Sequence, residues 1–341
     1  MEESLNKKAI LSLGGAVLLP EGFVIPGRVS HSTAGPGAGF GSIAFSFDGY
    51  RVKKSISYED GEFELHEGDG GLYLTHRGEP FIDPIGIEPI VRHCPEQAFF
   101  NLDPRCMFRC AYCNSPMLGM DQDKHLSADR IMEMLEESMS DHEVVAVSFT
   151  SGVVGSVDET VDRFVEIVGR VRDEYPEIPI GVEPYVSCRE HILMLKEVGA
   201  DEIKINLETP DRGIFARVCP DLDYDSILEL LKEAVGIFGK GSVISNIIYG
   251  LGETDRCLED AMVLLCSMGV IPGLRALRVN SMNRERIIAA IGDPEPVTPD
   301  RAIRLATIQK ATMAKYGLTT RSSHTMCMEC GCCDLVPFRD L

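Results

Sequence analysis

The stretch Cys106-Met107-Phe108-Arg109-Cys110-Ala111-Tyr112-Cys113 decides how this chain is interpreted, because its three cysteines form a C-x3-C-x2-C pattern. A [4Fe–4S] cluster normally takes four thiolate ligands. Three thiolates on one short loop would leave one iron open to a small-molecule ligand. The alternatives are a zinc site and three buried thiols. Zinc usually takes four protein ligands in paired Cys or Cys/His groups, and no histidine lies beside this loop in the sequence.

The length and composition are those of an enzyme with one large domain and an appendage. A chain of 341 residues with 44% hydrophobic residues can bury a full core. Its 12 cysteines cluster in motifs within a long acidic chain, which favours metal ligation in a reducing cytoplasm over a disulfide framework. The net charge of −20 argues against a nucleic-acid-binding surface. No apolar run is long enough to span a membrane.

The segment before residue 96 predicts a small β-rich domain. Runs such as 42–47 and 71–75 alternate apolar and polar residues and are separated by Gly, Pro and Asp. At the start of the chain, Lys7-Lys8 and the apolar stretch 9–19 resemble a signal peptide, but no small-x-small cleavage site follows. We therefore expect an N-terminal strand there.

From about residue 95 onward, apolar runs alternate with amphipathic stretches. In chain order these segments are 144–149, 158–171, 178–186, 190–197, 202–207, 224–238, 242–249, 256–268 and 274–279. Strand-helix-strand repetition of this kind predicts an α/β fold with a parallel sheet that curves toward a barrel. About six βα units fit between residues 99 and 323, fewer than the eight of a full barrel.

The end of the chain is dense in potential metal ligands. Four cysteines occupy seven positions, namely Cys327, Cys330, Cys332 and Cys333. Such density predicts a second metal centre. Buried thiols are one alternative and a zinc site is another, because four thiolates can satisfy zinc. Cys94, which stands alone before the first barrel strand, is interpreted as a packed thiol rather than an extra ligand.

The cysteine spacing and the aromatic Tyr112 before the third cysteine resemble the radical S-adenosylmethionine (SAM) superfamily. In that superfamily the amine and carboxylate of SAM chelate the open iron. The resemblance implies a [4Fe–4S] cluster on Cys106, Cys110 and Cys113, with SAM as the second cofactor. It also implies a partial (βα)6 barrel, similar to a TIM barrel. We expect the barrel over residues 96–320, the β-rich domain over 1–95 and a cluster-binding tail over 321–341.

Further motifs at predicted strand ends resemble the SAM-binding positions of biotin and lipoyl synthases. Ligands of parallel barrels lie at these carboxyl ends. The resemblance implies that Thr150-Ser151-Gly152 receives the SAM amino group and that Arg217 pairs with the SAM carboxylate. Asn206 and Glu208 match the strand that contacts the ribose, and Glu183 ends the preceding strand.

The run Gly250-Leu251-Gly252-Glu253-Thr254 has a form shared by biotin synthase, lipoyl synthase and the diiron-hydrogenase maturase. The resemblance implies that Gly250 and Gly252 let the backbone close on the adenosyl group. Glu253 and Thr254 can cap the next helix.

The element Arg321-Ser322-Ser323 resembles the barrel end of lipoyl synthases, in which a serine ligates an auxiliary cluster that is consumed as the sulfur source. Here the spare cysteines follow this element, as fits the two-component lipoyl synthases common in archaea. The resemblance implies sulfur insertion into an octanoyl chain on a carrier protein. It also implies a second [4Fe–4S] cluster, whose expected ligands are Cys327, Cys330 and either Cys332 or Cys333, with Ser322 or Ser323 as a further ligand.

The resemblance also implies partners. We expect a ferredoxin or flavodoxin as electron donor, received by a basic patch around Lys53-Lys54 or Arg109, together with an acylated carrier protein and a second radical SAM subunit. Two other functions stay open. One is a radical SAM enzyme that methylates or rearranges a cofactor precursor or a protein side chain and keeps its tail cluster intact. The other is a non-catalytic iron–sulfur scaffold, which would not need the ordered SAM motifs.

Overall fold

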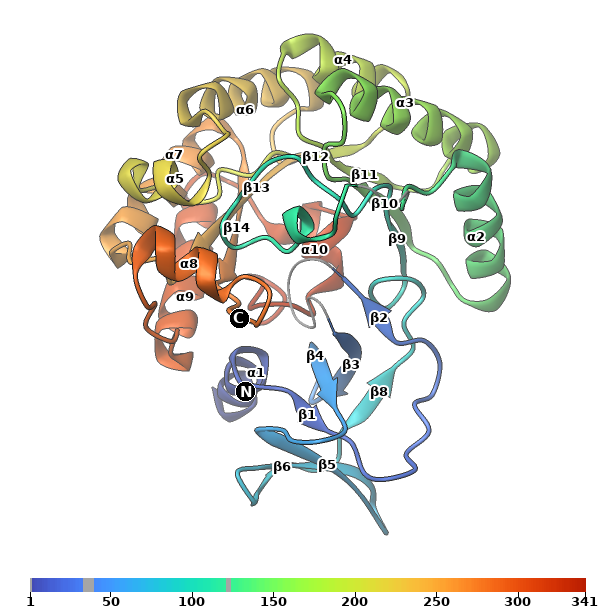
Figure 1. Cartoon of the computed structure of the whole chain (residues 1–341), viewed down its shortest axis with the longest axis vertical. Coiled ribbons are helices and arrows are strands. Elements are labelled where there is room, and N and C mark those ends of the chain that lie inside the picture. Colours follow the sequence, from blue (N-terminus) through green and yellow to red (C-terminus); the bar gives the residue numbers. More distant parts are fainter. Residues whose placement is uncertain (1, 33–39, 121–123) are drawn as a thin grey trace.

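The structure is a computed structural model that describes residues 2–32, 40–120 and 124–341. Two sheets organise the described chain, one in the N-terminal segment and one in the barrel segment (Figure 1). No helix in these ranges is long and apolar enough to cross a membrane.

The chain begins with a helix, so the expected N-terminal strand is wrong. Helix α1 spans Glu2–Leu13, and of the apolar stretch only Val17–Leu18 is extended, as strand β1. The reason is the spacing of the buried residues on α1, which are Lys8, Ala9, Leu11 and Ser12. This spacing of one, three and four residues is the period of a helix with one packed face.

The N-terminal domain is a mostly antiparallel sheet of eight strands. After β1 come β2 (Ser30–His31), β3 (Gly41–Phe47), β4 (Tyr50–Ser57), β5 (Phe63–Gly68), β6 (Gly71–His76), β7 (Glu79–Ile82) and β8 (Gly86–Glu88). Strand β1 runs parallel to both β4 and β5, between which it lies. Phe45, Phe63 and Leu65 are among the buried side chains that form its core.

The second sheet confirms the predicted α/β barrel of six parallel strands. Its strands are β9 (Gln97–Asn101), β10 (Ala146–Thr150), β11 (Ile180–Glu183), β12 (Glu202–Lys204), β13 (Val243–Tyr249) and β14 (Ile271–Ala276). They pair in chain order and all in parallel. Strands β9 and β14 are the edges, so the barrel is open on one side, where the N-terminal domain lies (Figure 1).

Helices cover the outer face of the strands (Figure 1). They are α2 (Ala128–Asp141), α3 (Val157–Glu174), α4 (Arg189–Glu197), α6 (Tyr224–Phe238), α7 (Asp255–Met268) and α9 (Pro299–Lys315). The short helices α5 (Arg212–Val218) and α8 (Arg284–Ile291) pack against each other. Side chains of Ser127, Ser156 and Asp223 cap the N-termini of α2, α3 and α6. These caps satisfy backbone N–H groups that the helix itself leaves unpaired.

The C-terminal tail packs closely against the barrel strands. It contains the short helices η2 (Thr320–Ser322) and α10 (Met326–Cys330). The carboxylate of Glu202, at the start of β12, accepts hydrogen bonds from the Ser323 and Thr325 hydroxyls and from the backbone of His324. A Cβ atom added to Gly181 on β11 would lie 2.3 Å from the Thr325 hydroxyl oxygen. The strand therefore needs glycine where the tail approaches.

The N-terminal domain holds the same tail from the other side. The backbone N–H of Lys53 on β4 donates to the carbonyl of Cys332 at 2.7 Å. The buried ammonium of Lys8 donates to the Gly331 carbonyl at 2.8 Å and forms an ion pair with Asp340 at 2.7 Å. The tail is thus fixed between the domain and the barrel.

Candidate active site

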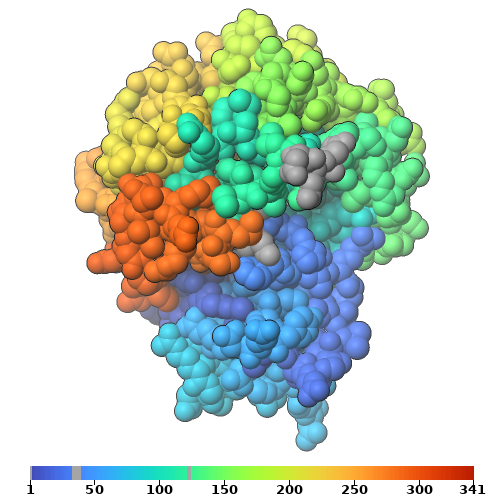
Figure 2. All heavy atoms as spheres, viewed as in Figure 1, coloured from blue at the N-terminus to red at the C-terminus, as the bar shows by residue number. Residues whose placement is uncertain are grey.

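A cavity of about 1030 Å³ lies at the carboxyl ends of the barrel strands. Asn101, Thr150 and Glu183, the last residues of β9, β10 and β11, line it. The N-terminal domain contributes Arg28 and His31. In the space-filling view this domain, in blue, adjoins the teal segment after β9 and the orange segment that carries α8 (Figure 2).

Cys106, Cys110 and Cys113 line this cavity from the loop that follows β9. All three are free thiols. The loop is tied down by its backbone, since Met107 N–H donates to the Val153 carbonyl and Ala111 N–H donates to the Val218 carbonyl, both at 2.8 Å. Burial raises the pKa of Cys113 to about 11, so a metal must displace its proton to bind.

The donor set at this loop fits a cubane cluster. Within the described ranges, no group of three or more His, Cys, Asp or Glu side chains is gathered as a single metal ion requires. In a [4Fe–4S] cluster each thiolate binds a different iron, so the thiols need not converge on one point. Cys106, Cys110 and Cys113 all line the cavity, so they could hold three irons of such a cluster.

Thr150, Ser151 and Gly152 line the cavity next to the cysteine loop. A Cβ atom added to Gly152 would lie 1.9 Å from the Arg105 carbonyl oxygen and 3.0 Å from the Cβ of Cys106. The glycine is therefore required for the close approach of the two loops. The Ser151 hydroxyl donates to the Gly152 carbonyl at 2.8 Å.

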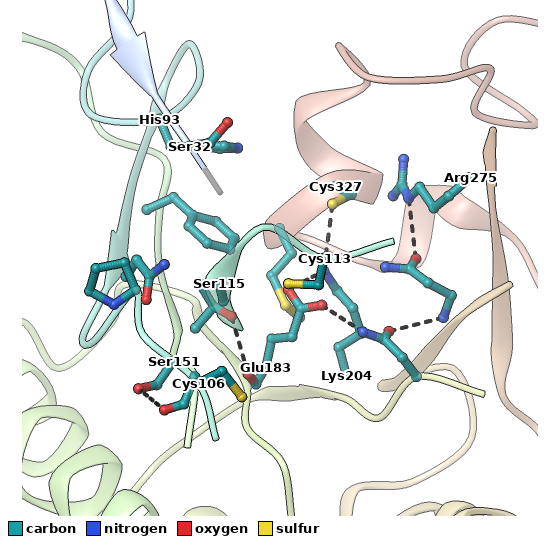
Figure 3. A pocket seen from close by; sticks show the side chains of 18 of the residues that line it. Ser32, His93, Cys106, Cys113, Ser115, Ser151, Glu183, Lys204, Arg275 and Cys327 are labelled. Carbon is teal, nitrogen blue, oxygen red and sulfur yellow. Dashed lines mark hydrogen bonds and ion pairs between the residues drawn. The ribbon is translucent and has the colours of Figure 1, made fainter. Parts of the chain in front are cut away.

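Polar side chains at the ends of β11 and β12 form a network inside the cavity (Figure 3). The Lys204 ammonium donates to one carboxylate oxygen of Glu183 at 2.8 Å. The Asn206 amide donates to the other oxygen at 2.9 Å. Lys204 also lies 3.5 Å from the sulfur of Cys327. The network therefore connects the expected SAM side of the cavity with the tail.

Glu208 has a rare backbone conformation, and the pKa of its carboxyl group is raised. Its φ is 68°, in the left-handed region that side chains other than glycine rarely adopt. Such conformations persist where the surroundings fix them, often at functional sites. Burial raises the pKa of Glu208 to about 7, although a hydrogen bond with Tyr112 opposes this shift. Tyr112 and Glu208 both line the cavity.

Four expected SAM contacts do not line the cavity in the described structure. Arg217 lies on an exposed position of α5. Gly250 and Gly252 belong to a turn before α7, in which Gly250 N–H donates to Glu253 at 2.8 Å. Glu253 also forms an ion pair with Arg301 on α9 at 2.9 Å, so its carboxylate is engaged by the turn and by this helix. Thr254 caps α7, as its sequence position suggested.

The two expected serine ligands also have other partners. The Ser322 hydroxyl donates to the Thr319 carbonyl at 2.9 Å, and the Ser323 hydroxyl donates to Glu202 at 2.8 Å. Neither serine lines the cavity. The tail cysteines Cys327, Cys330 and Cys333 do line it, whereas Cys332 is buried and does not.

The predicted basic patch at Lys53-Lys54 is wrong, because both side chains are buried. The ammonium of Lys54 donates to the Gly14 carbonyl at 2.6 Å, and burial lowers its pKa well below the usual value. Arg109 is exposed, and it pairs with Asp221.

Sequence reasoning missed the cations around the tail cysteines. Arg275 and Arg278 share the carboxylate of Asp334, at 3.3 and 3.2 Å. Burial lowers the pKa of Lys204, but nearby Cys327 and Glu183 outweigh it and the net shift is upward. One signal was available, because Arg275 interrupts the otherwise apolar strand β14.

The comparisons with known proteins agree with this geometry. Residues 100–265 match the model of the Radical SAM superfamily. Biotin synthase of Persephonella marina is 28% identical over 159 residues, which are 44% of this chain and 43% of that protein. Lipoyl synthase of Glaesserella parasuis is 30% identical over 172 residues, which are 48% and 51% of the two chains. The chain thus spans about half the length of these curated relatives.

A solved structure shows the same fold. The FeFe-hydrogenase maturase HydG from Carboxydothermus hydrogenoformans superposes with a TM-score of 0.54 at 15% identity, covering 64% of this chain and 51% of that one. Taken with the cysteine loop, these findings establish that the chain contains a radical SAM domain. Within that class, its sequence similarity is to biotin and lipoyl synthases, at low identity.

Proposed function

We propose that this chain is a radical SAM enzyme that inserts sulfur into an octanoyl chain carried by a protein, as one subunit of a two-component lipoyl synthase. One observation carries the proposal. Cys106, Cys110 and Cys113 line the same cavity as Cys327, Cys330 and Cys333. C–H activation and sulfur delivery would therefore share one space. The similarity to lipoyl synthase supports the substrate class.

The cavity residues suit SAM binding. When bound, a [4Fe–4S] cluster with SAM and one electron supplies a 5′-deoxyadenosyl radical, which abstracts hydrogen from an unactivated C–H bond. Glu183 and Glu208 offer carboxylate acceptors for ammonium and hydroxyl donors. Asn206 and Lys204 orient Glu183, and Gly152 keeps its loop against Cys106.

The sulfur donor in this proposal is a tail cluster, which acts as a substrate. Each insertion replaces one C–H bond with one C–S bond. The hydrogen leaves in 5′-deoxyadenosine, and the electron released when the C–S bond forms reduces cluster iron. Apolar side chains suited to an acyl chain line the cavity, including Phe99, Phe108, Ile205 and Ile248.

The proposal includes the partners implied by this chemistry. A ferredoxin or flavodoxin would supply the electron that cleaves SAM. An acylated carrier protein would present the octanoyl group, and a second radical SAM subunit would add the other sulfur.

The test follows sulfur during turnover. We would incubate the reconstituted protein anaerobically with SAM, reductant and an octanoylated lysine peptide, and measure 5′-deoxyadenosine, thiolated peptide and remaining sulfide. We expect sulfide loss to match the thiolated product, and a variant with Cys327, Cys330, Cys332 and Cys333 all changed to Ala to cleave SAM without making that product. SAM cleavage with an intact tail cluster and an alkylated or rearranged product would overturn sulfur insertion.

A further inference from the structure

We infer that Cys94 is a ligand of the tail cluster and that Cys332 is not. The cluster would then have a complete set of four thiolates, namely Cys94, Cys327, Cys330 and Cys333. The inference rests on the proposed function only in requiring an iron–sulfur cluster at the tail. It does not depend on whether that cluster gives up sulfur.

The placement of the thiols carries this inference. Cys94 lines the cavity together with Cys327, Cys330 and Cys333, although it lies more than two hundred residues earlier in the chain. Cys94 and Cys330 pack together in one small buried group, against which Phe99 is placed. A cubane takes four thiolates, and four thiols line the cavity in addition to those of Cys106, Cys110 and Cys113.

Cys332 is the fifth thiol of the region, and it differs from the other four in its position relative to the cavity. It belongs to the same buried group but does not line the cavity. Its thiol donates to the Cys330 carbonyl at 3.2 Å. Its own carbonyl accepts the backbone N–H of Lys53 at 2.7 Å. Cys332 therefore acts as a packed residue that positions the turn between Cys330 and Cys333.

The backbone fixes Cys94 independently of any ligand. The Cys94 carbonyl accepts the N–H of Val91 at 3.1 Å, and Cys94 forms an isolated antiparallel bridge with Gln97 at the start of β9. The Gln97 amide in turn donates to the Met326 carbonyl at 3.1 Å, next to Cys327. The strand that follows Cys94 is thus tied to the helix that carries the tail cysteines.

The charges around this site also suit four thiolates. A [4Fe–4S]²⁺ core with four thiolates has a formal charge of −2. Two carboxylates, Glu183 and Asp334, lie among cations near the tail cysteines. Those cations, in the described part of the chain, are Lys53, Lys204, Arg275 and Arg278. Lys53 donates to the Ser30 hydroxyl and the His93 carbonyl, which are both uncharged. These cations would stabilise the negative charge of such a cluster.

The inference is tested by single substitutions in the full chain. We would reconstitute the wild type and the variants Cys94→Ala, Cys332→Ala and Cys266→Ala anaerobically, and measure iron, labile sulfide and Mössbauer spectra. Cys266 is a matched control, because it is as buried as Cys94 but does not line the cavity. We expect about eight irons in the wild type, Cys332→Ala and Cys266→Ala, which corresponds to two cubanes.

In Cys94→Ala we expect the tail cluster to be lost or converted to a three-iron form, while the other cluster still gives its SAM-dependent spectral change. That retained change shows that the variant is folded. Full retention of both cubanes in Cys94→Ala would overturn the inference, as would loss of a cluster in Cys332→Ala or a wild type with only one cubane. Failure of sulfur insertion in a wild type with two cubanes would reject the proposed function alone.

Discussion

The ammonium of Lys204 lies between a carboxylate and a thiol, 2.8 Å from Glu183 and 3.5 Å from the sulfur of Cys327. Lys204 is the last residue of β12, and only 1% of its side chain is exposed. One buried cation therefore contacts both the group expected at SAM and the first tail cysteine. A change in charge at either group will alter the electrostatic potential at the other, because burial weakens solvent screening.

Replacing Lys204 by Met should lower the reduction potential of the tail cluster. A unit charge roughly 8 Å from the cluster, at an effective dielectric constant of about 20, favours the reduced form by about 2 kcal/mol. The measurement is a redox titration followed by electron paramagnetic resonance. Lys232→Met, at an exposed position of α6, is the control and should leave the potential unchanged. An unchanged potential in Lys204→Met would place the cluster away from this lysine.

Changing Cys106, Cys110 and Cys113 together to Ala should abolish 5′-deoxyadenosine formation. About four irons should remain per chain, because the tail thiols are untouched. Iron analysis and product chromatography check this outcome. Loss of all iron would mean that the two sites do not form independently.

SAM binding should strengthen as the pH rises through about 7, because Glu208 has a raised pKa of about 7. Below that pH its carboxyl group is protonated and is a weaker acceptor for ribose hydroxyls. Above that pH the carboxylate accepts such bonds fully. Calorimetric titration between pH 6 and 8 measures the effect. Glu208→Gln should bind SAM weakly at every pH, and an equal pH dependence in this variant would assign the titration to another group.

Gly152→Ala should disturb the cysteine loop, since the new Cβ atom would lie 1.9 Å from the Arg105 carbonyl oxygen. A displacement of about 1 Å at a reacting group can lower a rate about 100-fold. We expect a fall of that order in SAM cleavage. Gly236→Ala is the control, because nothing lies within 4 Å of the added atom. Normal SAM cleavage in Gly152→Ala would show that the loop adapts.

Ser323→Ala should reduce stability without removing iron. Its hydroxyl donates to the buried carboxylate of Glu202 at 2.8 Å, and a hydrogen bond to a charged group contributes about 1.5–3 kcal/mol. Chemical denaturation and iron analysis on the same samples separate the two effects. Ser322→Ala, at an exposed position, should change neither quantity. Loss of about four irons in either variant would instead support a serine ligand.

The sequence predicted the elements whose signal is local. Apolar periodicity gave helix 224–238, which coincides with α6 at Tyr224–Phe238. It failed for α1, where a short apolar run can belong to a helix or to a strand. The sequence also failed to predict that Lys53 and Lys54 are buried, since lysine is usually exposed. Each ammonium donates to backbone or side-chain acceptors that only the folded chain brings close.

The site was predictable only in part, because some of its residues are close in the sequence and others come together only on folding. The C-x3-C-x2-C spacing lies within eight residues, so the sequence displays it directly. The contact between Cys94 and Cys330 joins distant segments, and no local pattern announces it. The Gly250–Glu253 turn shows the opposite case, since its motif is recognisable but its position relative to the cavity depends on how β13 and α7 are packed.

The path of the tail has a consequence for the order in which the molecule matures. The three cysteines of the loop after β9 lie within eight residues of one another, so their spacing is set locally. The tail site joins segments such as Gln97 and Met326, which lie 229 residues apart, and contacts at such separations form late because closing long loops costs entropy. The proposed tail cluster would therefore receive its iron only after the rest of the barrel has folded.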